Sequence, residues 1–127
     1  TVDDINVVFI THSHMDHYKS IGMFPNAKAL DYWGWWEGDF WKDCNGHVNE
    51  NMSIIKTPGH SNDSITLLVK TKDGTIAVCG DVIWKENASE HDKFAVDMET
   101  LKKSRKKVKE VADWIVPGHG GMFKNNR

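Results

Sequence analysis

The chain has 127 residues, of which 39% are hydrophobic and 27% are charged, and its formal net charge is −2. This composition is typical of one globular domain and excludes nucleic-acid binding through an overall basic charge. No apolar run approaches the roughly 18 residues that span a bilayer, and no secretory leader pattern opens the chain. Cys44 and Cys79 are too few for a disulfide framework. We therefore expect an intracellular protein, cytoplasmic or nuclear, that has no membrane association.

The first third of the chain contains two predicted strands and an aromatic segment. Residues 5–10, INVVFI, form a β-branched apolar run that predicts a buried strand, and a second strand is expected at 27–31. A short helical segment is expected between them at 16–22. The segment 31–41, DYWGWWEGDFW, has no clean period of 2 or 3.6 residues. We predict that it is a loop that packs over the core or contacts another chain, or whose aromatic rings hold a substrate.

The middle of the chain predicts antiparallel sheet. Three strands are expected at 52–57, 64–70 and 75–79, and Asp73-Gly74 forms the turn of a hairpin between the last two. A further short strand is expected at 114–116, directly before the sequence Pro-Gly-His-Gly-Gly.

An amphipathic helix is predicted between the last two of these strands. Apolar residues recur at helical spacing from 97 to 112, and Asp97 is a suitable N-cap. Six of the eight residues 102–109, KKSRKKVK, are basic. Such a run is typical of a solvated helix face, and less often of a phosphate-binding patch.

Histidines and aspartates follow the ends of the predicted strands. The segment 11–17, THSHMDH, comes directly after the first strand, and the other members stand in the turns TPGH, CGD and PGHG. Because one sheet fixes its strand ends at one rim, we expect these side chains to converge. Imidazole and carboxylate groups without thiolate suit zinc, with manganese or iron as alternatives. The predicted metal ligands are His12, His14, Asp16, His17, His60, Asp81 and His119.

The spacing within THSHMDH predicts two metal ions. Alternate residues of an extended segment point the same way, so His12 and His14 reach one cation, while Asp16 and His17, past the bend, reach another. His47 and His91 fit no such spacing and are expected to bind no metal.

This pattern resembles the metallo-β-lactamase superfamily, and the likeness runs from about residue 5 to residue 119. The resemblance implies an α/β fold, the αββα sandwich, for residues 1–127 as a single domain. It also implies two zinc ions: His12, His14 and His60 would hold the first, Asp16, His17 and His119 the second, and Asp81 would bridge them.

One departure from the family concerns the amino-terminal side of the fold. Family members have further strands, with an Asp-Thr-Gly-like motif, before the histidine motif, whereas this chain begins at Thr1 with one strand ahead of it. We therefore expect a sandwich that lacks part of its N-terminal layer. A complementary chain or a homo-oligomer would then complete it, unless the chain is a truncated product.

The resemblance implies a binuclear hydrolase in which a metal-bridging hydroxide attacks the substrate. Asp81, where true β-lactamases commonly carry Cys or Ser, points away from drug hydrolysis. The segments TPGHSNDS and KKSRKKVKEVADWIVPGHGGMF are similar to the metallo-β-lactamase-domain-containing protein 1 family, whose activity is endoribonucleolytic. We expect cleavage of RNA or another phosphodiester, with Asp16 and Asp81 as the catalytic carboxylates.

Two alternatives to a nuclease stay open. The same centre suits a thioesterase, a glyoxalase II-like enzyme or a lactam hydrolase, because the ligands do not distinguish a carbonyl from a phosphoryl substrate. The chain is alternatively a non-catalytic metal-binding fragment or assembly module, whose adhesive surface would be the aromatic segment 31–41.

Overall fold

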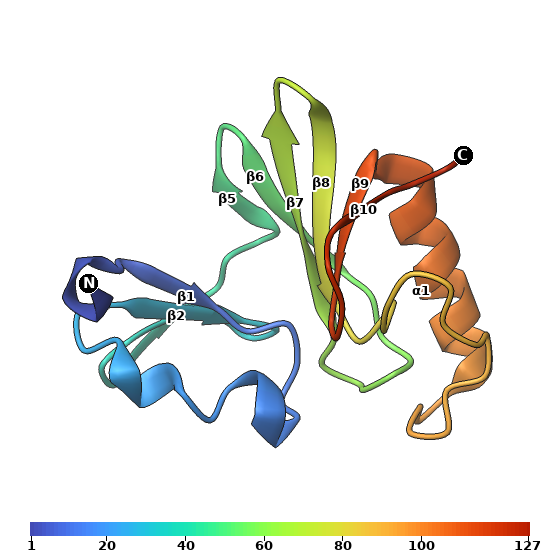
Figure 1. Ribbon diagram of the computed structural model, residues 1–127. Coiled ribbons are helices and arrows are strands. Elements are labelled where there is room, and N and C mark those ends of the chain that lie inside the picture. The colour runs from blue at the N-terminus through green and yellow to red at the C-terminus, as the bar shows by residue number, and fades with distance from the viewer.

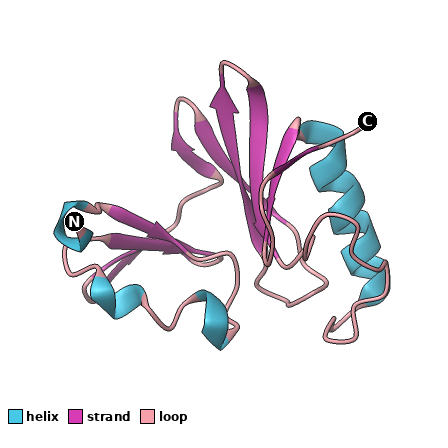
Figure 2. Cartoon of the chain, in the orientation of Figure 1, coloured by secondary structure: helices cyan, strands magenta, loops and turns pink.

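A computed structural model describes residues 1–127 and shows two β-sheets and one α-helix (Figures 1 and 2). The first sheet has four strands in the order β1 (Val7–Phe9), β2 (Lys28–Asp31), β3 (Gly34–Glu37) and β4 (Phe40–Lys42). β1 and β2 are parallel and the other neighbours are antiparallel. The β-branched run at 5–10 therefore forms β1, as predicted, but the expectation that this strand is buried is wrong. β1 lies at one edge of the sheet, and Val7 is 45% exposed.

The second sheet has six strands in the order β10-β9-β8-β7-β6-β5. All neighbours are antiparallel except β8 and β9, which are parallel because the chain crosses over through the helix between them. The strands predicted in the middle of the sequence form its centre. The members of this sheet are β5 (His47–Asn49), β6 (Met52–Lys56), β7 (Ile65–Thr71), β8 (Gly74–Gly80), β9 (Trp114–Pro117) and β10 (Phe123–Lys124).

The helix α1 (Met98–Val111) covers the face of the six-stranded sheet that is turned away from the first sheet (Figure 1). Asp97 is its N-cap, as predicted, and accepts hydrogen bonds from the backbone N–H groups of Glu99 and Thr100. Leu101 and Val108 are fully buried against the sheet. The core between helix and sheet consists of Ala77, Cys79, Val82, Ile83, Leu101, Val108, Ala112 and Ile115.

Short 3-10 helices lie beside the first sheet. They are η1 (Val2–Asp4), η2 (Met15–His17) and η3 (Ile21–Met23), and the last two occupy the segment expected to be helical. The structure contains no helix with the length and apolar character that crossing a membrane requires.

The prediction of a loop at residues 31–41 is wrong, because this segment forms the β3–β4 hairpin. Gly38 occupies the first position of the two-residue turn between Glu37 and Phe40 and has a φ of 57°. Trp36 lies opposite Trp41 in the hairpin. Both faces of these short strands carry aromatic residues, so the apolar–polar alternation that identifies a strand is missing from the sequence.

The contact of α1 with the second sheet gives a prediction for stability. We expect Leu101→Ala to lower the free energy of unfolding by about 2–5 kcal/mol, because it leaves a cavity in the core. Val111→Ala on the same helix removes a side chain that is 41% exposed and should cost less than about 1 kcal/mol. Urea unfolding of both variants checks this, and equal losses would contradict it.

Candidate metal centre

The predicted ligands lie where four strands end. His12 and His14 follow β1, His60 follows β6, Asp81 follows β8 and His119 follows β9. These ends gather where the two sheets approach each other, at the bottom of the view in Figure 1. The backbone N–H of Ile65, at the start of β7, donates to the carbonyl of Thr11 over 2.9 Å, which joins the segment before His12 to the second sheet.

Three of the four ligands in the first group are buried, and His14 is half-buried. His12 and His60 are 2% and 3% exposed, and Asp81 is 6% exposed. Nε2 of His60 lies 3.0 Å from Nδ1 of His14 and 3.3 Å from Oδ2 of Asp81. One ligand atom from each of His12, His14, His60 and Asp81 lies within 4.8 Å of the others.

The second group is open to solvent on one side. Nε2 of His17 lies 3.2 Å from Oδ2 of Asp16 and 3.3 Å from Nε2 of His119. The side chains of Asp16 and His119 are 57% and 35% exposed. Asp81 also reaches this group, because its two oxygens lie 3.3 Å from His17 and 3.2 Å from His119. Asp81 therefore lies between the two groups.

The buried atoms of this cluster fit cations. Nε2 of His12 and Oδ1 of Asp81 are buried without a hydrogen-bond partner, which is costly for groups that stay unpaired. Burial, together with the neighbouring His17, lowers the pKa of His12 to about 4, so its imidazole is neutral near pH 7. Nδ1 of His12 contacts Oγ1 of Thr11 at 3.0 Å, which leaves Nε2 to face the cluster. Nitrogen and carboxylate ligands without sulfur suit zinc or iron.

The structure brings all seven predicted ligands together in two groups, with Asp81 in contact with both. His47 and His91 are exposed and belong to neither group.

Asp92 is a site residue that the sequence pattern does not reveal. Its Oδ2 lies 2.6 Å from Nδ1 of His60, and its Oδ1 accepts a hydrogen bond from the backbone N–H of Phe94. Burial opposes ionisation of Asp92, but these hydrogen bonds outweigh it and keep the pKa of the carboxyl below its usual value. A carboxylate at Nδ1 fixes the orientation of the imidazole, so that Nε2 of His60 points at the cluster.

Asp63 joins two of the loops that carry ligands. Its Oδ2 accepts hydrogen bonds from the backbone N–H and the hydroxyl of Ser13, between His12 and His14, and its Oδ1 accepts one from Ser61, next to His60. A single carboxylate thereby fixes the spacing of these loops. Asp63 lies in the segment TPGHSNDS (57–64), three residues after His60, but its spacing from the histidines does not predict this role.

Gly118 allows Asp81 to take its position. A Cβ at Gly118 would overlap Oδ1 of Asp81 and would lie 2.9 Å from the backbone carbon of Gly80. Any side chain at residue 118 would therefore displace the carboxylate that lies between the two groups.

Solved structures show which fold this is. AidC, a dizinc quorum-quenching lactonase, superposes with a TM-score of 0.75 at 14% identity, over 98% of this chain and 61% of AidC. TTHA1623 in a di-iron-bound form superposes with a TM-score of 0.67 at 17% identity, over 93% of this chain and 71% of that protein. ST1585 of Sulfolobus tokodaii, a metallo-β-lactamase superfamily protein, superposes with a TM-score of 0.60 at 16% identity, over 94% of this chain and 63% of that protein. The chain has the metallo-β-lactamase fold, as the sequence predicts, with α1 as the helical layer on the second sheet.

No family model matches the chain, but its sequence has curated relatives. It is 32% identical over 131 residues to metallo-β-lactamase domain-containing protein 1 of Xenopus laevis. The alignment covers 95% of this chain and 56% of the Xenopus protein. The chain spans about half the length of the curated relatives it matches. The chain is thus similar in sequence to metallo-β-lactamase domain-containing proteins, and it carries a cluster of histidines and aspartates that could hold metal ions.

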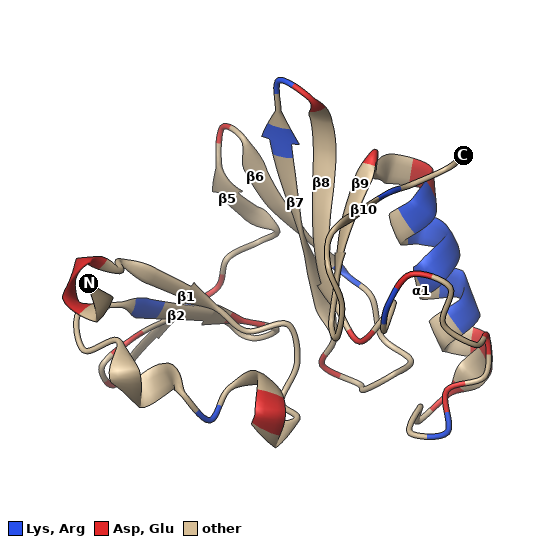
Figure 3. Ribbon diagram, viewed as in Figure 1, with Lys and Arg blue, Asp and Glu red and all other residues tan.

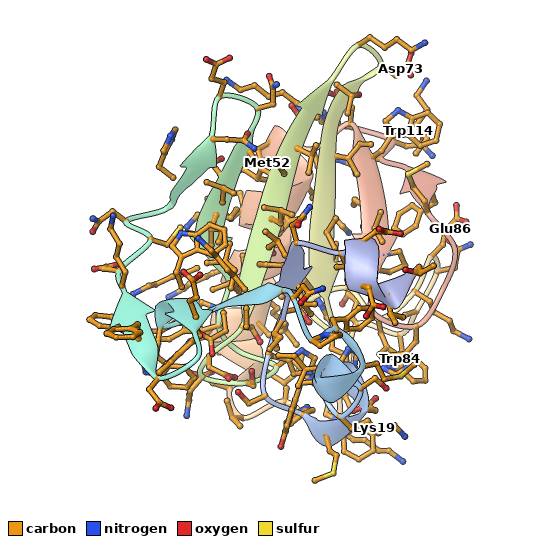
Figure 4. All side chains as sticks on the ribbon, turned by 90° about the vertical axis from the view of Figure 1, so that its left-hand side faces the viewer. Lys19, Met52, Asp73, Trp84, Glu86 and Trp114 are labelled. Atoms are coloured by element: carbon orange, nitrogen blue, oxygen red, sulfur yellow. The ribbon has the colours of Figure 1, made fainter.

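The contact of Asp92 with His60 predicts an effect on metal affinity. We expect Asp92→Asn to weaken zinc binding by about 10- to 100-fold, because an amide holds the imidazole less firmly. Competition with a chromophoric chelator measures the dissociation constant. The matched control is Asp73→Asn, in the β7–β8 turn at the opposite end of the molecule from Trp84 (Figure 4). An affinity of Asp92→Asn within about threefold of the control would contradict this role.

The close approach of Gly118 to Asp81 predicts a second effect. We expect Gly118→Ala to lower metal affinity by about tenfold or more, since the new methyl group displaces the Asp81 carboxylate. Gly121→Ala is the control, because a Cβ there meets no heavy atom within 4 Å. Elemental analysis after dialysis against a weak chelator compares the two. Equal metal contents would show that Asp81 does not depend on Gly118.

Proposed function

We propose that this protein is a metal-dependent hydrolase, and more narrowly a phosphodiesterase that cleaves RNA, using two zinc ions held by the seven clustered residues. The observation that carries the proposal is the position of Asp81, a buried carboxylate in contact with His60 on one side and His17 and His119 on the other. Such an arrangement suits two cations that share one carboxylate.

Each group of ligands has its own role in this proposal. His12, His14 and His60 would hold one ion in the buried half, and Asp16, His17 and His119 the second ion in the open half. When bound, such a pair of ions supplies Lewis acidity, which activates water and stabilises the charge that develops on the substrate.

Asp16 is the carboxylate that we assign to proton transfer. It is 57% exposed, lies 3.2 Å from His17 and stands on the solvent side of the cluster, where a substrate approaches. From this position its free carboxylate oxygen can orient an attacking water and accept its proton. Asp81, which is buried, has no such access and serves to hold the two halves together.

A phosphodiester is favoured over a carbonyl substrate for two reasons. Asp81 stands where drug-hydrolysing relatives carry Cys or Ser, and the segments around His60 and His119 resemble a family with endoribonuclease activity. The lactonase AidC has the same fold, so a lactone belongs among the substrates to be tested.

Two further expectations stay predictions. One is that a second copy of the chain or a complementary chain completes the fold, and the other is that the protein is intracellular.

Substrate assays test the proposed reaction. The zinc-loaded protein should hydrolyse bis(4-nitrophenyl) phosphate and a labelled single-stranded RNA, and EDTA should abolish both activities. Nitrocefin, a glutathione thioester and N-hexanoyl-homoserine lactone serve as the carbonyl substrates. An EDTA-sensitive rate with a carbonyl substrate alone would overturn the assignment to phosphodiesters.

The metal content tests the proposed ligands independently of any substrate. We expect about two zinc ions per chain in the wild type and fewer in His12→Ala, because this variant removes a buried ligand. His47→Ala, which removes an exposed histidine of β5, is the control and should keep the wild-type content. A His12→Ala variant with unchanged metal content would refute the assignment of His12.

A further inference from the structure

A basic groove lies beside the metal centre, between α1, the segment 83–90 after β8 and the segment 123–127. Its volume is about 910 Å³. Seven Lys and Arg residues and three Glu residues line it, an excess of four positive charges in a chain whose net charge is −2. Figure 3 shows the blue bands of Lys and Arg along α1. The basic lining residues are Lys85, Lys102, Arg105, Lys106, Lys109, Lys124 and Arg127.

The groove adjoins the metal centre through Trp84. The centroid of the Trp84 ring lies 5.0 Å from that of His119, and the backbone N–H of His119 donates to the carbonyl of Trp84 over 2.7 Å. Trp84 also lines the groove and is 44% exposed. Figure 4 shows Trp84 at the same end of the molecule as Lys19, which follows the histidine motif. One side chain therefore contacts both the open half of the metal centre and the groove.

The cations of the groove differ in how they are used by the fold. Arg105 is committed to structure, because its guanidinium donates to the backbone carbonyls of Val82 and Glu90 and so holds the wall of the groove to α1. Lys109 and Lys124 have no carboxylate within ion-pair distance. Lys106 has only a solvated pair with Glu110 at 3.8 Å. These three ammonium groups are free to bind an anion.

We propose that this groove binds the phosphate chain of a single-stranded polynucleotide whose scissile bond lies at the metal centre. The inference rests on the proposed function and adds a binding site to it. Aligned cations bind successive phosphates, and the helical rise places Lys102 and Lys109 about 10 Å apart along α1, a length that spans more than one phosphate. The exposed Trp84 ring at the junction is suited to stacking on a base, which distinguishes a polynucleotide from an acidic peptide.

Binding in the presence of EDTA tests the groove separately from cleavage. The probe is a fluorescent single-stranded RNA of about 12 nucleotides, within the range of lengths that such sites bind. In K106E/K109E/K124E we expect the affinity for this RNA to fall by about 10- to 100-fold. We also expect the plot of the logarithm of the association constant against the logarithm of the salt concentration to become less steep by about 2, which corresponds to three lost phosphate contacts. The matched control K72E/K103E/K107E changes the net charge equally at residues outside the groove, and should bind within about threefold of the wild type.

The outcomes separate this inference from the proposed function. Equal losses in the two variants would show that overall charge, and not the groove, governs binding and would overturn the proposal. So would unchanged binding in K106E/K109E/K124E, or equally strong competition by polyglutamate of the same length. Hydrolysis of bis(4-nitrophenyl) phosphate by the zinc-loaded wild type tests the reaction alone, because this diester is too short to extend along the groove. A groove that binds RNA in a protein without this activity would overturn the proposed function only.

Discussion

The buried carboxylate of Asp81 is the constraint on which the rest of the site depends. It lies between imidazoles of both ligand groups, is 6% exposed, and one of its oxygens has no hydrogen-bond donor. A buried carboxylate oxygen that lacks a donor is costly unless cations or protonated partners balance its charge. Nε2 of His12 is likewise buried and unpaired, and the low pKa of His12 makes that imidazole a poor source of positive charge. The same arrangement that would be unfavourable in an ordinary core is therefore suited to bind metal.

The sheets and α1 serve to hold this cluster in place. The carbonyl of Pro58, two residues before His60, accepts a hydrogen bond of 2.6 Å from Ser104 in the middle of α1. Asp92 approaches the same histidine from the loop before the helix, and Asp63 ties its loop to the histidine motif. The buried half of the centre is thus rigidly supported. The half with Asp16 and His119 faces solvent, which gives the site a direction of approach for substrate.

The sequence predicts which histidines and aspartates cluster at this site, but not the residues that support them. His12, His14 and His60 are recognisable because each follows an apolar strand at a turn. The expectation that one sheet brings these ends together is wrong, because β1 belongs to the four-stranded sheet and β6 to the six-stranded sheet. Asp92 has no such signal, because it lies in a loop 32 residues from His60 and only the tertiary fold brings them together. Some elements of the fold also lack a signal in the sequence. Long apolar strands and the capped helix were predictable, whereas the aromatic β3–β4 hairpin and the short edge strands β5 and β10 carry no clear periodicity.

Anomalous diffraction from zinc-loaded crystals, measured on both sides of the zinc absorption edge, tests the two-cation account most directly. The account predicts two peaks about 3.5–4 Å apart, one among His12, His14 and His60 and the other among Asp16, His17 and His119, with Asp81 in contact with both. A single peak, or peaks away from Asp81, would contradict it.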